Sequence, residues 1–190
     1  LTGTILKGAD LTDVILPNVS LSEKDFQKTV FNGVNLSGKD LSSSSLWYAS
    51  FKNTNLKNTN LSYADLMMSD LTKIKNKSLA GSNLSNTSFF LSNLSGIDLS
   101  GVILEGTYFA EADLSGLDFT VTSKRPYNGS VFTKANLSNS NFEGVILSPA
   151  KVFTTPFINE AREFEYHYFH GRDLVLELFG PGFDNIHITS

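Results

Sequence analysis

A leucine or phenylalanine recurs at every fifth position through most of this chain, and this period constrains the fold more than any other feature. The first run holds fifteen such positions, from Leu1 to Leu71, and the second holds ten, from Ile74 to Phe119. A third run begins at Phe132 and extends toward Phe157. A period of five matches neither a helix nor a plain strand. It indicates a chain that turns a corner every five residues, so that four corners close a square coil of twenty residues.

Each repeat also carries a mostly small or β-branched residue two places before its leucine or phenylalanine, as at Ala9, Val34 and Ala64. Alternation along a short extended segment points both residues inward. Asp or Asn often stands between them, as in "GADLT" and "KANLS". This A(D/N)LXX pattern resembles the pentapeptide-repeat family from Leu1 to about Phe157. The resemblance implies an all-β, right-handed quadrilateral β-helix of about seven coils, stacked at the inter-strand spacing of ~4.8 Å.

Two segments interrupt the period, "KIKNK" at 73–77 and "TSKRPYNGS" at 122–130. The second contains a proline and an Asn-Gly pair, which predict a surface loop. For the first, the favoured arrangement gives Ile74 the corner after Leu71. That arrangement predicts one stacked column of Phe31, Phe51, Leu71, Phe89, Phe109 and Phe132. The alternative is a three-residue insertion between Leu71 and Leu79, with Ile74 outside the core.

The repeat stops after Phe157, which divides the chain into a β-helix at 1–157 and a different segment at 158–190. In that segment "EFEYHYF" and "LVLELF" predict short strands joined by tight turns. The alternative for "INEAREF" is a short amphipathic helix. The segment is interpreted as a cap over the last coil or as the start of a further domain. The sequence does not specify the oligomeric state.

Composition argues against catalysis, bound cofactors and a membrane span in this chain. Cysteine is absent and no run of 18 apolar residues occurs. His167 and His170 have a spacing that suits a metal only on a helix, because on a strand they point to opposite faces. We therefore expect no enzyme activity, metal or cofactor in this region, and a catalytic domain adjoining it remains compatible with the sequence.

The charge distribution bears on two activities that the family resemblance implies. Residues 1–157 have no net charge and residues 158–190 carry −4. Between residues 78 and 123 the chain has no base and five acids, an acidic belt formed by Asp98, Glu105, Glu111, Asp113 and Asp118. Some family members act on type II topoisomerases as DNA mimics. A neutral rod mimics a duplex poorly, although this belt could imitate a short piece. The absence of a basic face argues against direct nucleic-acid binding.

The family's second use is as a recognition or scaffold domain in bacterial proteins, including effectors secreted into host cells. We therefore predict a non-catalytic rod that binds a protein partner, in the bacterial cytoplasm or in a host cell. With twenty residues per coil, Trp47 lies beside Met67 and Tyr48 beside Met68, at outward positions. Tyr63 holds the same kind of position on the preceding face. Such a patch is typical of binding hot spots. The alternative is that another segment of the protein covers it.

Overall fold

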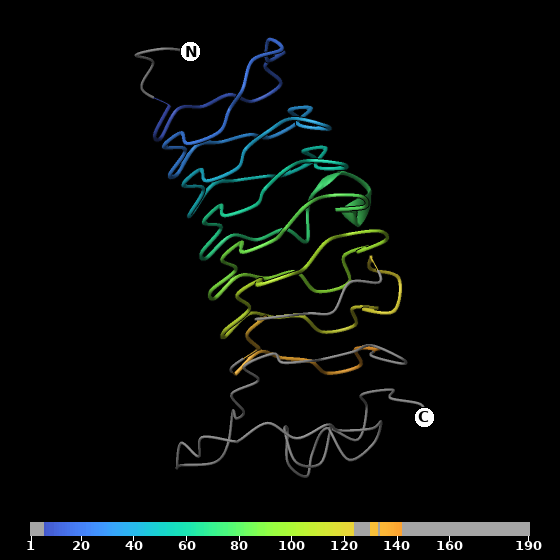
Figure 1. Ribbon diagram of the computed structural model, residues 1–190. Coiled ribbons are helices and arrows are strands. Elements are labelled where there is room, and N and C mark those ends of the chain that lie inside the picture. The colour runs from blue at the N-terminus through green and yellow to red at the C-terminus, as the bar shows by residue number, and fades with distance from the viewer. Residues whose placement is uncertain (1–5, 124–129, 133, 142–190) are drawn as a thin grey trace.

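The described part of the computed structural model comprises residues 6–123, 130–132 and 134–141. It winds into stacked four-cornered coils (Figure 1). Single parallel β-bridges join each coil to the next, such as Asp25 to Ser45 and Asn35 to Asn55. These pairs are twenty residues apart, which confirms the predicted length of a regular coil. The number of coils in the whole chain and the division at residue 157 stay predictions, because residues 142–190 lie outside the described part.

Local hydrogen bonds explain why five residues make one corner. In the repeat around Leu46, the Ala49 N–H donates to the Leu46 carbonyl at 2.9 Å and closes the turn. In the next coil, the Asp65 carboxylate accepts the Met67 N–H at 3.0 Å. Asp or Asn before the central residue therefore stabilises the turn that follows it. The second residue after the central one lies in the left-handed region, as at Tyr48 with φ 57°.

Buried hydroxyl groups tie successive coils together inside the rod. The Thr54 hydroxyl donates to the Phe31 carbonyl at 2.7 Å, and the Ser92 hydroxyl donates to the Leu66 carbonyl at 2.8 Å. Thr54 is fully buried and Ser92 nearly so. A buried hydroxyl without a partner would cost free energy, so these bonds explain why Ser and Thr are accepted beside a core of Leu and Phe.

The first interruption is a three-residue insertion, and the favoured arrangement of the sequence analysis is wrong. Before it Phe51 lies beside Leu71, but after it Asp65 bridges Ser88 and Asp70 bridges Asn93, twenty-three residues on. Phe89 therefore lies beside Leu66, and the predicted six-residue column is split between two columns. The alternative is wrong about Ile74, which is 3% exposed and belongs to the core. The extra residues form the short 3₁₀ helix η1 (Lys75–Lys77).

Aromatic rings stack within each of the two columns. Phe31 and Phe51 have ring centroids 5.7 Å apart and an interplanar angle of 5°. Phe89 and Phe109 lie 5.5 Å apart, and Phe132 continues that column 5.2 Å from Phe109. The favoured arrangement predicted these neighbouring pairs correctly but joined them across Leu71.

The second interruption also adds three residues to the register. Gly101 pairs with Val121, twenty residues on, whereas Tyr108 bridges Val131, twenty-three residues on. Residues 124–129, where the loop is predicted, lie outside the described part. No described residue belongs to a helix long and apolar enough to cross a membrane.

Candidate functional site

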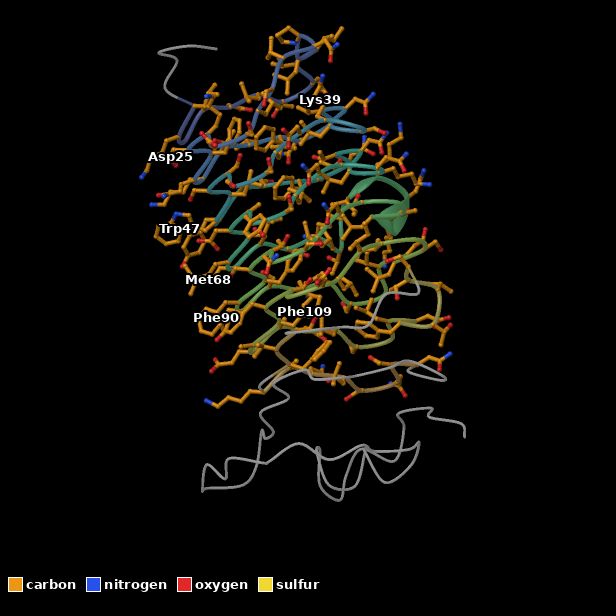
Figure 2. The ribbon with its side chains drawn as sticks, in the orientation of Figure 1. Asp25, Lys39, Trp47, Met68, Phe90 and Phe109 are labelled. Atoms are coloured by element: carbon orange, nitrogen blue, oxygen red, sulfur yellow. The ribbon has the colours of Figure 1, made fainter. Side chains whose placement is uncertain are left out.

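The corrected register brings six large apolar side chains together at one corner of the rod. They occupy the first and second positions after the central residues Leu46, Leu66 and Phe89. We call this set the apolar ridge: Trp47, Tyr48, Met67, Met68, Phe90 and Leu91. Figure 2 shows the labelled residues Trp47, Met68 and Phe90 following one another down the same edge of the rod.

Backbone hydrogen bonds fix the vertical order of the ridge. The Tyr48 N–H donates to the Met67 carbonyl at 3.2 Å, the Met68 N–H to the Phe90 carbonyl at 2.9 Å, and the Leu91 N–H to the Ala110 carbonyl at 3.2 Å. Each level is one coil, so three levels of the ridge span about 10 Å between the first and the last. The predicted alignment of Trp47 with Met67 and of Tyr48 with Met68 is confirmed by this register.

The ridge is exposed although it is largely apolar. Tyr48 is 47%, Met68 37% and Leu91 41% exposed, while Trp47, Met67 and Phe90 are half-buried. The rings of Trp47 and Tyr48 lie 5.3 Å apart. Single exposed apolar residues are ordinary, whereas a continuous set of this kind is typical of contact surfaces.

Tyr108 extends the aromatic surface beside the last level of the ridge. It directly precedes the central residue Phe109, and its ring lies 6.3 Å from that of Phe90. Tyr63, which the sequence analysis grouped with the ridge, lies at the preceding corner, after Leu61. Its N–H donates to the Ser85 carbonyl, and its side chain is 66% exposed.

Phe90, Leu91 and Tyr108 were not predicted as part of this surface, because the favoured register placed them on another face. The signal that could have found them is the spacing of eight between Leu71 and Leu79. Eight is the period of five plus three, so a three-residue insertion explains this spacing, and Ile74 does not need to occupy a corner. With that register, Phe90 falls directly after Met67 in the same column.

Charged residues stand at both ends of the ridge. Lys28 lies one level before Tyr48, because its N–H donates to the Trp47 carbonyl at 3.0 Å. Glu111 follows Ala110 one level after Leu91, and its carboxylate contacts the Lys134 ammonium at 3.2 Å. Lys7 and Asp25 form a further exposed pair at 3.5 Å near the first end. The ridge is therefore apolar at its centre and charged at both ends.

The backbone of the ridge corner differs from that of two other corners. After Gly8, its second turn positions all have φ between 55° and 59°, and they hold Lys28, Tyr48, Met68, Leu91, Glu111 and Lys134. At the corners after Leu71 and Leu56, every described residue with positive φ in these columns is Gly, Asn or Asp. Those residues tolerate the left-handed region, whereas a bulky residue there costs on the order of 1 kcal/mol.

The acidic belt does not form one stripe. Asp98 and Asp118 share one column, Asp113 lies at the corner before it, and Glu105 and Glu111 follow central residues of two different columns. Hydrogen bonds from the Ser100 hydroxyl and N–H and from the Ser78 hydroxyl hold the pKa of Asp98 below its usual range. The Asp98 carboxylate is thus engaged in hydrogen bonds within the rod. The five acids surround the rod and do not line one side.

Among the described residues, no group of three or more His, Asp or Glu side chains is placed to hold a metal ion. His167, His170 and the rest of 158–190 lie outside the described part.

Comparison with known proteins places this repeat in a family. The family model described as "Pentapeptide repeats" matches residues 4–38, 35–72, 76–106, 92–120 and 128–148. None of the curated proteins compared with the sequence matches it. Among solved structures, HetL from the cyanobacterium Nostoc sp. strain PCC 7120, involved in heterocyst differentiation regulation, is 24% identical, with 76% of this chain and 70% of HetL covered and a TM-score of 0.38.

Two further solved structures are similar at lower identity. Full-length QnrB1, a plasmid-mediated fluoroquinolone resistance protein, is 14% identical, with 97% of this chain and 86% of QnrB1 covered and a TM-score of 0.41. A pentapeptide-repeat protein from the thylakoid lumen of Arabidopsis thaliana is 20% identical, with 76% and 72% covered and a TM-score of 0.26. TM-scores this low carry no inference about function. The family match covers well over half of the sequence, and the chain belongs to the pentapeptide-repeat family, whose fold is a right-handed quadrilateral β-helix.

Proposed function

We propose that this chain is a non-catalytic, protein-binding rod and that the apolar ridge is its binding surface. The partner that suits the ridge is a protein whose contact surface is apolar at its centre and charged at its margins. Trp, Tyr and Met supply large contact areas and are frequent in binding hot spots. Lys28 and Glu111 at the two ends would contribute to the orientation of the partner.

The observation that carries this proposal is the backbone conformation of the ridge. Tyr48, Met68 and Leu91 hold a left-handed conformation that Gly or Asn would adopt at lower cost. They do not repay that cost by burial in the rod, since all three are exposed. Strained positions with exposed bulky side chains are typical of functional surfaces.

A capture experiment with full-length protein tests the proposal. Trp47→Ser combined with Met67→Ser removes the first turn residue at two adjacent levels of the ridge. Lys57→Ser combined with Ala80→Ser makes the matched change at the corner after Leu56 and Leu79. We expect both variants to keep the thermal unfolding midpoint within a few degrees, and only the ridge variant to lose its partners from a lysate of the source organism.

Fluorescence gives a second measurement, because Trp47 is the only tryptophan in the chain. Partner binding at the ridge should shift its emission to the blue and protect it from acrylamide quenching. If the ridge variant unfolds, or if it captures the same proteins as the control variant, the ridge is not the binding surface. If Trp47 is already protected in the isolated chain and deletion of 158–190 exposes it, that segment covers the ridge instead.

A recognition role within a secreted bacterial effector is one setting that we propose for such a rod. Its test is the full-length gene, in which a catalytic domain would adjoin this region. DNA mimicry of a type II topoisomerase substrate is less favoured, because the acidic belt surrounds the rod and Glu111 is paired with Lys134. Absence of any effect on gyrase supercoiling at micromolar protein would exclude that alternative.

A further inference from the structure

We propose that the partner at the apolar ridge is a second copy of this chain, bound antiparallel about a two-fold axis at the level of Met68. This inference rests on the proposed function, since it names the protein that the ridge binds. It follows from the order of side chains along the ridge corner, which is self-complementary when one copy is inverted.

The second turn positions of the ridge corner read, from the first level to the last, Lys28, Tyr48, Met68, Leu91 and Glu111. Met68 is the middle of this series, with Lys28 two levels before it and Glu111 two levels after it. A two-fold axis perpendicular to the rod and lying in the interface reverses the levels but keeps each column facing itself. Lys28 of each copy then faces Glu111 of the other, whose carboxylate also contacts Lys134 of its own copy. The levels of Lys28 and Glu111 are about 19 Å apart on one rod.

The apolar levels match under the same rotation. Met68 faces its own copy at the axis, and Tyr48 faces Leu91. In the column of first turn positions, Trp47 faces Phe90 and Met67 faces Met67. Each aromatic residue therefore meets an apolar side chain of the other copy, as an isologous interface requires. Asp65 directly precedes the central residue Leu66 on the straight segment of the coil. It therefore lies beside this contact and not among the turn residues that form it.

Other ways of pairing the two ridges either place like charges together or leave Lys28 facing an apolar residue. A parallel pair about an axis along the rod sets Lys28 against Lys28 and Glu111 against Glu111. Moving the antiparallel axis half a level toward Leu91 sets Lys28 against Lys134, and moving it half a level toward Tyr48 sets Lys28 against Leu91. Like charges opposed at an interface suppress the wrong pairing. The charge order thus selects the antiparallel pair centred on Met68.

The contact is narrow, so we expect a weak dimer. Five levels of one corner form a surface at the low end of the range for specific interfaces. The dissociation constant should lie in the micromolar range and rise with salt, because exposed charge pairs are screened. Sedimentation equilibrium of the full 190-residue chain measures this constant. The emission of Trp47 should shift to the blue over the same range of protein concentration.

Charge reversal tests the pairing directly. Lys28→Glu and Glu111→Lys should each raise the dissociation constant about tenfold at low salt, and the two together should restore it to within about threefold. Both turn positions accept either residue, since Glu23 and Lys134 hold the same conformation, with φ 57° and 55°. Glu23→Lys is the matched control at another corner and should leave self-association unchanged.

Cysteine cross-linking tests the axis, because the chain has no cysteine of its own. Met68→Cys should form a disulfide-linked dimer on mild oxidation, and Asn58→Cys at another corner should not. Tyr48→Cys mixed with Leu91→Cys should cross-link more than either variant alone. A chain that stays monomeric at several hundred micromolar, or charge reversals without rescue, would overturn the antiparallel dimer. If capture of another protein still depends on Trp47 and Met67 in that case, the proposed function stands while this inference fails.

Discussion

Deleting Lys75, Asn76 and Lys77 should leave the fold intact and make it more stable. The deletion joins Ile74 to Ser78 and produces "LTKISLAGS". In this segment Leu71 and Leu79 are five residues apart and Ile74 stands two places before Leu79, as in a regular repeat. All later pairs keep their partners, because Leu79 still lies beside Leu56 and Leu84 beside Leu61. The coil simply changes from twenty-three residues to twenty.

The expected magnitude follows from the bonds and the conformations that disappear. Lys75 N–H donates to the Thr54 carbonyl at 2.9 Å, and Lys77 carbonyl accepts the Asp98 N–H at 2.8 Å. After the deletion, Ser78 and Ile74 supply the equivalent groups. One exposed bond, from Lys77 N–H to the Ile74 carbonyl, is lost and costs about 1 kcal/mol.

Against that loss, the deletion removes the strained Lys77 and the ordering of three exposed residues. Asn76 has φ 56° and Lys77 has φ 46°, and a bulky left-handed residue costs about 1 kcal/mol or more. Ordering a residue costs about another 1 kcal/mol. Ordering of three residues and the strain at Lys77 together outweigh the lost bond, so the free energy of unfolding should rise by about 3 kcal/mol.

Urea unfolding followed by circular dichroism measures this change. Deletion of 57–59 is the matched control, since it also removes three residues but takes out the buried Thr59, whose hydroxyl donates to the Leu36 carbonyl at 3.0 Å. The control should lose cooperative unfolding. If deletion of 75–77 lowers the free energy of unfolding by more than about 1 kcal/mol, η1 supports the fold and the reasoning about register is wrong.

Three further changes test the core, the ridge and the turn carboxylates. Phe109→Ala should lower the free energy of unfolding by about 3–5 kcal/mol, because it removes a ring stacked on both sides, and urea unfolding measures the loss. Tyr48→Gly should raise the free energy of unfolding by about 0.5–1 kcal/mol, through relief of the left-handed Tyr, while weakening ridge binding in the capture assay. Asp98→Asn should flatten the acid limb of the stability profile: its folded pKa is lowered, so its contribution is present above the unfolded pKa of about 3.9 and is lost as pH falls through the folded value.

The coil could be predicted from the sequence because its determinants are local. The central Leu or Phe, the small residue two places earlier and the Asp or Asn between them each act within one turn, as Asp65 does toward Met67. The period therefore carries the fold without knowledge of distant contacts. The family resemblance added the shape of the coil, and the bridges twenty residues apart agree with it.

The register across the first interruption could not be predicted with the same certainty, because two placements of Ile74 satisfy the local pattern. Ile74 is apolar and fits either a corner or an inward position. Packing decides between them: as an inward residue it is buried at 3% exposure, while three polar residues leave the wall as η1. The same choice sets which side chains follow Met67 in its column, so an error of one corner concealed Phe90 and Leu91, a third of the ridge.

The turn conformation links the repeat to the function that we propose. Most described corners of this repeat have a left-handed residue, and Gly or Asn adopts that conformation at the lowest cost, as at Gly38, Asn58 and Gly81. A repeat that served only to build a rod would favour these residues at all four corners. The corner after Leu61 is mixed, with Glu23 and Tyr63 among its left-handed residues. The ridge corner holds a bulky left-handed residue at every described level after Gly8, and the exposed side chains of Tyr48 and Met68 do not strengthen the rod. Their free-energy cost is explained if stability is exchanged for contact with another molecule, and a second copy of the chain meets the charge order that surrounds them.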